Sequence, residues 1–124
     1  MKSTTTPTRE QAVEPEELAR LFVERVNAGD AEGIAELYEP DAVLGFPPGT
    51  ATVGRQAIRA VFEQFIAQPQ RPRFEQEEAL PTLHQGDLAL TATRPTDNSS
   101  GRAQVARLQA DGTWLRIIDR PESR

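Results

Sequence analysis

Apolar residues in the first half of the chain recur at the spacing of one helical face, which predicts three amphipathic helices. The first is expected from about residue 14 to Gly29, and the second is capped by Asp30 and stopped by Pro40. The third follows Gly54 and ends before Pro69. The apolar positions are Leu18, Leu21, Phe22 and Val26, then Ile34, Leu37 and Tyr38, then Ile58, Val61, Phe62, Phe65 and Ile66.

The second half of the chain changes to short strands separated by turn signals. The expected strands cover residues 73–83, 88–94, 102–108 and 113–119, joined by QGD at 85–87, PTDNSSG at 95–101 and DG at 111–112. An earlier strand over 42–46 enters a Pro-Pro-Gly loop and returns over 50–53. Helices first and strands second predict an α+β fold with the helices on one face of a mostly antiparallel sheet.

The chain has 124 residues, which is enough for one hydrophobic core and short for two. We therefore expect a single domain over residues 14–121. Residues 1–13 are rich in Thr, Pro and charge and have no apolar period, which predicts a flexible tail. Residues 122–124 are expected to form a polar C-terminal tail.

Charge and composition exclude several classes of partner and site. The net charge of −5 opposes attraction to phosphate backbones and anionic lipid, so neither nucleic acid nor a membrane is expected as a partner. With no cysteine and one histidine, a thiol nucleophile or a Cys- or His-rich metal site is excluded, and we expect no metal and no cofactor. The N-terminus has no apolar h-region, and no stretch approaches a membrane span, which predicts a cytoplasmic protein.

Five segments in order resemble the SnoaL-like branch of the nuclear transport factor 2-like, or ketosteroid isomerase-like, superfamily. They are NAGD, YEPDAVL, VGRQAI, HQGDLAL and DGTWLRIIDRP, and the resemblance covers about residues 15–121. The I-D-x-P ending is similar to uncharacterised bacterial members. The resemblance implies a cystatin-like cone, in which three N-terminal helices pack on the concave face of a curved, mostly antiparallel sheet. It also implies a homodimer with an interior cavity, but fold alone does not give function.

The resemblance allows the isomerase chemistry to be tested residue by residue. Those enzymes carry a tyrosine in the first helix, a general-base aspartate after the first strand and a protonated aspartate on the third meander strand. The matching positions here hold Phe22, Phe46 and Gln104. A phenyl ring neither abstracts a proton nor donates to an oxyanion, so the steroid isomerase mechanism is disfavoured. A fold-related epoxide hydrolase would need two aspartates bridged by an arginine around a water, and the sequence does not assemble that set.

Asp119 is the best candidate for a catalytic base, with Gln104 as the group that steadies a developing oxygen charge. Asp119 ends an apolar strand, and strand alternation groups it with Leu115 and Ile117 on the side expected to face inward. Some SnoaL-like cyclases resemble this arrangement in using a late-strand carboxylate. Alternatively, Asp119 caps the strand end or pairs with an arginine, and a bulge would reverse its facing.

The remaining candidates define an expected pocket and several structural positions. The ligand-binding positions are expected to be Phe22, Leu44, Phe46, Phe62, Arg94 and Ala106. Arg94 would grip a carboxylate ligand if it faces inward, and otherwise lies at an exposed strand end. We expect His84 in an exposed turn, Tyr38 and Trp114 in structural packing or a dimer contact, and Glu75, Glu77 and Glu78 on a solvated surface.

These features predict an apolar pocket that binds a small hydrophobic or carbonyl-bearing molecule in a homodimer. Cofactor-free acid/base chemistry of the isomerase, cyclase or hydratase type would fit such a pocket. The alternative is a noncatalytic module in which the same pocket binds a ligand or the dimer serves protein interaction.

Overall fold

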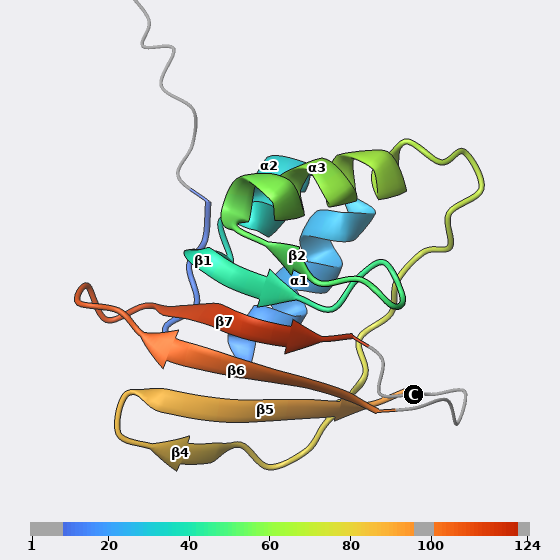
Figure 1. The fold of residues 1–124 in the computed structure, drawn as a ribbon. Helices are drawn as coiled ribbons and strands as arrows, with labels where there is room; N and C mark the ends of the chain where they lie inside the picture. Colours follow the sequence, from blue (N-terminus) through green and yellow to red (C-terminus); the bar gives the residue numbers. More distant parts are fainter. Residues whose placement is uncertain (1–8, 96–100, 122–124) are drawn as a thin grey trace, which may run out of the picture.

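The computed structural model describes residues 9–95 and 101–121, which fold into three helices and seven strands (Figure 1). In chain order these are α1 Glu17–Asn27, α2 Ala31–Ala35, β1 Tyr38–Leu44, β2 Thr52–Val53, α3 Arg55–Ile66, β3 Glu78–Ala79, β4 Leu83–Gln85, β5 Leu88–Arg94, β6 Arg102–Leu108 and β7 Trp114–Arg120. The sheet order is β2-β1-β7-β6-β5-β3, and β4 also pairs with β5. The pair β1–β7 is parallel and the other pairs are antiparallel, so the expected α+β class is confirmed.

The helices gather on one side of the sheet and bury their apolar faces against it (Figure 1). Helix α1 buries Leu18, Leu21 and Val26, and the chain leaves it through Gly29, whose φ of 72° suits a residue without a side chain. Helix α3 begins directly after Gly54, at φ 97°. The first and third predicted helices are therefore confirmed to within a few residues.

The second helix is shorter than predicted, because the chain becomes a strand where the helix was expected to continue. Helix α2 ends at Ala35, and Tyr38 opens β1 instead of extending the helix. Pro40 lies inside β1, where the register with β7 shifts between Tyr38 and Val43. Proline has no N–H to donate, so it is accepted at such an irregularity in the ladder. Pro40 lies in an irregular part of a strand, so the prediction that it stops the second helix was wrong.

The strand predicted over residues 73–83 is also wrong. Residues 67–77 cross from the end of α3 to the far edge of the sheet without pairing, and the short strands Glu78–Ala79 and Leu83–Gln85 then pair with β5. The reason is visible at Phe74, whose N–H donates to Asn27 Oδ1 at 2.8 Å and whose carbonyl accepts from Asn27 Nδ2 at 2.9 Å. A side chain satisfies the backbone groups that a neighbouring strand would otherwise have taken. We call residues 67–77 the linker.

A β-bulge in β7 decides which of its side chains face the helices. Gln104 lies opposite Asp119 and Val105 opposite Ile118, but Ala106 lies opposite Arg116, so Ile117 is an extra residue. Trp114 and Arg116 are therefore buried on the same side as Asp119. The predicted inward facing of Asp119 holds, but its grouping with Leu115 and Ile117 does not, since both are only half-buried and the bulge changes the alternation.

Part of the N-terminal segment that was expected to be a tail lies against the folded core. Ala12 is buried and its carbonyl accepts from the Trp114 N–H at 2.8 Å. Arg9 donates to Asp30, and the buried Arg25 donates to the carbonyls of Gly33 and Glu10. Residues 9–13 are therefore tied to the folded part of the chain. The predicted tails over 1–8 and 122–124 lie outside the described residues.

Candidate active site

A cavity of about 530 Å³ lies between the helices, the linker and the covered face of the sheet. This volume is in the range that accommodates a small organic ligand. Helices α1 and α3 and the loop after β1 supply apolar side chains, the linker supplies both apolar and charged ones, and strands β5, β6 and β7 supply polar ones. The residues that line the cavity include Phe22, Leu44, Phe46, Phe62, Phe65, Arg73, Phe74, Glu75, Glu77, Thr93, Arg102, Gln104, Arg116 and Asp119.

All five phenylalanines of the chain line this cavity. Their rings form a closed chain of contacts, with centroid distances of 5.5 Å for Phe22–Phe62, 6.3 Å for Phe62–Phe46 and 6.2 Å for Phe46–Phe65. The chain closes through Phe65–Phe74 at 5.7 Å and Phe74–Phe22 at 6.1 Å. We call these five residues the phenylalanine cluster. It brings together two helices, a loop and the linker, and it makes one part of the cavity wall aromatic.

Asp119 lies on the polar side of the cavity with 4% of its surface exposed. Its Oδ2 accepts from the Tyr38 hydroxyl at 2.6 Å and from Arg116 Nη1 at 3.2 Å. Its Oδ1 and the Arg116 Nε are buried and have no hydrogen-bond partner among the described residues. Buried polar atoms without partners are rare and costly, so this pair has unused hydrogen-bonding capacity beside a cavity.

The pKa values of Tyr38 and Arg116, the two groups that contact this carboxylate, are both shifted. Burial raises the pKa of Tyr38 well above its usual value, and the nearby charge of Asp119 raises it further, so the tyrosine stays a hydrogen-bond donor. Burial opposes the charge on Arg116, but Asp119 and Tyr38 outweigh that effect and its pKa lies above the usual value. Arg116 also lies over the Phe22 ring at 5.2 Å and the Tyr38 ring at 5.9 Å.

Gln104 faces the cavity from β6, directly opposite Asp119 in the ladder. The Thr91 hydroxyl donates to Gln104 Oε1 at 2.8 Å, which fixes the orientation of the amide. With its oxygen engaged, the Gln104 NH₂ is the half of the amide left to donate to a ligand. Asp119 and Gln104 occupy paired positions on neighbouring strands, so a hydrogen-bond acceptor and a hydrogen-bond donor lie side by side.

A second polar group lies where β5 and β6 meet the linker. Arg102 Nε donates to Glu77 Oε1 at 2.9 Å, and the Thr93 hydroxyl donates to the same oxygen at 2.9 Å. Arg102 Nη1 also donates to the Pro121 carbonyl at 2.9 Å. This partly exposed ion pair attaches the linker to the sheet, and its charges are mutually compensated.

The structure brings most of the predicted pocket residues together. Phe22, Leu44, Phe46, Phe62, Gln104 and Asp119 all line the cavity. Ala106 is fully buried in the hydrophobic core and is not among the lining residues. Arg94 is on the exposed side of β5, where it pairs with Glu78 at 3.2 Å, so its predicted contact with a ligand in the pocket was wrong.

Three other residues, His84, Glu77 and Glu78, were expected at the surface of the protein. His84 is exposed on β4, and its ring lies 5.8 Å from that of the buried Trp114. Glu78 is exposed as expected, but Glu77 is partly buried against Arg102. The sequence reasoning missed Glu77, Arg102 and the two phenylalanines Phe65 and Phe74 as cavity residues. The presence of all five phenylalanines before residue 75 was the one available signal.

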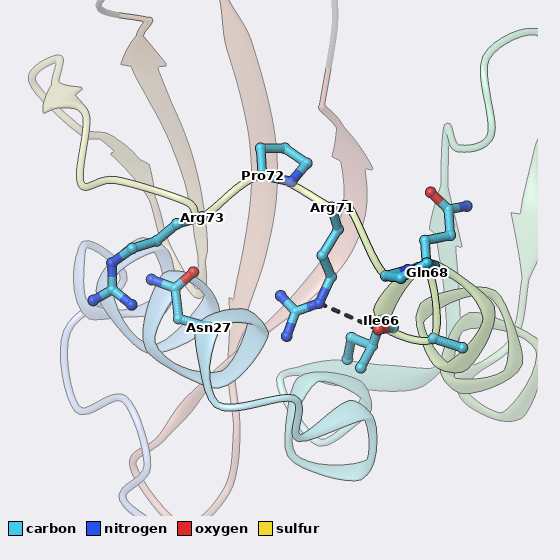
Figure 2. A pocket seen from close by; sticks show the side chains of 8 residues that line it. Asn27, Ile66, Gln68, Arg71, Pro72 and Arg73 are labelled. Atoms are coloured by element: carbon cyan, nitrogen blue, oxygen red, sulfur yellow. Dashed lines mark hydrogen bonds between the residues drawn. The ribbon is translucent and has the colours of Figure 1, made fainter.

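A second, more open depression of about 430 Å³ lies where the linker passes the ends of α1 and α3 (Figure 2). Arg71 points from the linker toward Ile66, and its guanidinium donates to the carbonyls of Ile66 and Val26 at 3.2 and 3.1 Å. Asn27, also in this depression, holds the backbone of Phe74. Arg71 thereby occupies the terminal carbonyls of both helices, and the depression is a fastening point for the linker.

Within residues 9–95 and 101–121, no cluster of three or more His, Cys, Asp or Glu side chains is arranged to hold a metal ion. In that same part of the chain, none of the helices has the length and apolarity needed to cross a membrane.

Comparison with known proteins agrees with the fold. The family model described as the SnoaL-like domain matches residues 19–117. A domain of unknown function with a cystatin-like fold from Nostoc punctiforme is similar with a TM-score of 0.70 and 22% identity, covering 86% of this chain and 73% of that one. A ketosteroid isomerase-like protein from Erwinia carotovora atroseptica has a TM-score of 0.65 and 19% identity, covering 85% and 89%. At these identities the likeness concerns the fold.

A stretch of 45 residues is 49% identical to the epoxide hydrolase LasB of Streptomyces lasalocidi. The match covers 36% of this chain and 16% of that protein.

Proposed function

This chain belongs to the SnoaL-like domain family, and from that premise and the geometry of the cavity we propose that it binds a small, largely apolar molecule and moves a proton on it. Asp119 would accept the proton, and Gln104 would donate a hydrogen bond to an oxygen of the bound molecule. The observation that carries this proposal is Asp119, which lines the cavity and whose buried Oδ1 has no donor among the described residues.

The proposed proton transfer needs only groups of the chain. Tyr38 and Arg116 hold Oδ2 and orient the carboxylate, which leaves Oδ1 to take a proton from an acidic C–H or O–H of the ligand. The electron pair of the broken bond moves onto a ligand oxygen, where the Gln104 amide stabilises the charge. Asp119 then returns the proton at another position. Isomerisation, cyclisation and hydration all contain such a step.

The partial match to an epoxide hydrolase adds opening of a strained ring by water to the reactions worth testing. An epoxide hydrolase built from two aspartates bridged by an arginine would need a second aspartate. Asp119 and Arg116 supply one aspartate and the arginine of such a set. The other acids that line the cavity are Glu75 and Glu77. Glu77 is already paired with Arg102, so proton transfer through Asp119 alone fits the described residues better.

The proposal predicts that the protein accelerates exchange of the α-protons of an enolisable cyclic ketone in deuterated water. β-Tetralone is a suitable probe, with exchange followed by proton NMR. Asp119→Asn should reduce the acceleration by about two to four orders of magnitude, as expected for the loss of a general base. Asp41→Asn, at an exposed position on β1, is the matched control and should leave the rate unchanged.

Loss of Asp119 also leaves Arg116 buried without its counter-ion, which costs about 3–5 kcal/mol of stability. Circular dichroism must therefore show that the variant is folded, and Gln104→Leu provides a second, uncharged test with an expected partial loss of exchange. Exchange by the wild-type protein at the rate of buffer would overturn the proposal.

The rival function is a noncatalytic ligand-binding module, and one observation favours it. Arg116 and Tyr38 both engage Oδ2, an arrangement that also serves as a buried structural link between β1 and β7. The module predicts that a ligand binds in the cavity without chemical change. Under this function Gln104→Leu would alter ligand affinity, but no proton exchange would be seen with any bound compound.

We also propose that the uncovered face of the sheet forms a homodimer. Six apolar residues on six neighbouring strands make one continuous cross-strand row on that face, opposite the cavity. Ladder pairing connects them in the order Leu83, Leu90, Val105, Ile118, Val43 and Val53. Four of them are among the exposed large hydrophobic side chains. A contiguous apolar surface of this kind is typical of a protein interface.

A further inference from the structure

The cavity lining also points to the class of ligand, and we propose that the preferred molecule is a flat, uncharged aromatic ring system that carries one hydroxyl group. This inference rests on the proposed function, because it describes the molecule that would lie beside Asp119.

The aromatic part of the ligand is inferred from the phenylalanine cluster. Phe22, Phe46, Phe65 and Phe74 remain partly exposed although each contacts two other rings of the cluster. Their exposed parts contribute to the wall of the cavity. A flat ring placed there gains edge-to-face and offset contacts that a saturated ring of equal area does not make.

The absence of net charge on the ligand is inferred from the charged residues of the lining. Three arginines and three carboxylates line the cavity, so their formal charges cancel. They are Arg73, Arg102 and Arg116 with Glu75, Glu77 and Asp119. Arg102 is engaged by Glu77, and Arg116 by Asp119. A carboxylate ligand would have to break one of these pairs or approach Asp119 against its charge, which disfavours an anion.

The hydroxyl group is inferred from Asp119. Its Oδ1 has no donor among the described residues, although a buried carboxylate oxygen gains most from an O–H or N–H donor. Tyr38 and Arg116 supply donors only to Oδ2. A phenolic or enolic hydroxyl would satisfy Oδ1, and its own oxygen would accept from the Gln104 amide, whose nitrogen makes no hydrogen bond within the described residues.

Calorimetric titration with four two-ring compounds tests each part of the inference separately. β-Naphthol has the full set of features, and its methyl ether lacks the donor. Decahydro-β-naphthol keeps the hydroxyl on saturated rings, and β-naphthoate carries a negative charge. β-Naphthol should bind at least about tenfold more tightly than the methyl ether, because the ether forfeits a hydrogen bond to a charged group. It should also bind more tightly than the other two compounds.

Two variants locate the binding. Asp119→Asn, if folded, should reduce the preference for β-naphthol over its methyl ether by about tenfold. Phe74→Leu removes one ring from the linker side of the cavity and should reduce the preference for β-naphthol over decahydro-β-naphthol. Val13→Ala, at an exposed position outside both the cavity lining and the apolar row, is the control and should change neither ratio. If Asp119→Asn does not fold, Gln104→Leu replaces it as the test, and this variant should weaken the binding of β-naphthol.

Equal binding of β-naphthol and its saturated counterpart, or tighter binding of β-naphthoate, would overturn the inference. The outcomes separate it from the proposed function. Asp119-dependent exchange of β-tetralone without any preference for β-naphthol would remove the aromatic class and leave the proton transfer standing. Asp119-dependent binding of β-naphthol without exchange would support the ligand class and contradict the proposed catalysis.

Discussion

Tyr38 is the only tyrosine of the chain, and its hydroxyl donates to the carboxylate of the buried pair Arg116–Asp119. Tyrosinate absorbance therefore reports this one site without any other substitution. Burial and the charge of Asp119 raise the pKa of Tyr38 far above the usual value of about 10. The folded protein should show no tyrosinate at a pH where an exposed tyrosine is already ionised.

The sign of the stability effect follows from linkage. Because folding raises the pKa of Tyr38, its contribution to the free energy of unfolding is present below about pH 10 and is lost as the pH rises toward the folded-state value. Tyrosinate should appear together with loss of the far-ultraviolet circular dichroism signal. Ionisation near pH 10 in a protein that remains folded would mean that Tyr38 is not buried against Asp119.

The inward position of Asp119 could be predicted from the sequence, but the contact with Tyr38 could not. Tyr38 had helical spacing with Ile34, so its position at the start of β1 was hidden by a local pattern that tertiary pairing overrode. Pairing of Asp119 with a nearby arginine was one of the predicted alternatives, and the extra residue Ile117 places Arg116 on the same side as Asp119. A bulge depends on the partner strand and leaves no periodic signal in its own sequence.

At the scale of elements, the start of α2 is fixed by contacts from outside the helix. Asp30 is the N-cap and accepts from the Gly33 N–H at 3.0 Å, while Arg9 donates to both of its oxygens. A Cβ on Gly33 would come within 2.1 Å of Asp30 Oδ2 and 2.8 Å of Arg9 Nε, so glycine leaves room for this arrangement. The predicted N-cap Asp30 is confirmed. Its partner Arg9 lies 21 residues earlier in the sequence, so no local pattern predicts that contact.

Two substitutions separate the cap from the ion pair. Asp30→Ala should lower the free energy of unfolding by about 1–2 kcal/mol, because it removes both. Asp30→Asn keeps a capping oxygen and should cost about 0.5 kcal/mol. Urea unfolding gives both values, and Asp41→Asn is the exposed control.

The same site has a defined acid dependence. The hydrogen bond from Arg9 lowers the pKa of Asp30, so its contribution to stability is present above about pH 4 and is lost as the pH falls. The wild-type protein should lose stability in acid more steeply than Asp30→Asn. Parallel acid profiles of the two proteins would contradict the pairing of Arg9 with Asp30.

The linker shows why the strand predicted over residues 73–83 was wrong, whereas the strands predicted over 88–94 and 102–108 match β5 and β6. Helical spacing is a local signal, and α1 and α3 were recovered from it. Residues 73–77 have the alternation of a strand, but their backbone is held by Asn27, a residue 47 positions earlier than Phe74. No local pattern contains that contact, and Phe74 enters the cavity lining because of it.

For the whole molecule, the row of apolar residues on the open sheet face predicts the oligomeric state. The protein should have about twice the 13.7 kDa mass of one chain by light scattering at micromolar concentration. Ile118→Lys places a charge in the middle of the row and should give the monomer mass with the fold retained. Val13→Lys changes another exposed apolar residue, away from the sheet, and should leave the dimer intact.

The proposed dimer would cover the sheet face opposite the helices, leaving the cavity on the other face. A wild-type protein of monomer mass would contradict it, as would a dimer that Ile118→Lys does not affect.

The central claim is that the cavity holds a small molecule against the unpaired oxygen of Asp119. It is tested most directly by a high-resolution crystal structure of protein purified without added ligand. We predict an open cavity between the phenylalanine cluster and β7, with a co-purified molecule or an ordered water donating to Asp119 Oδ1. A space closed by the phenylalanine rings, with Oδ1 bonded to a donor of the chain itself, would contradict the claim.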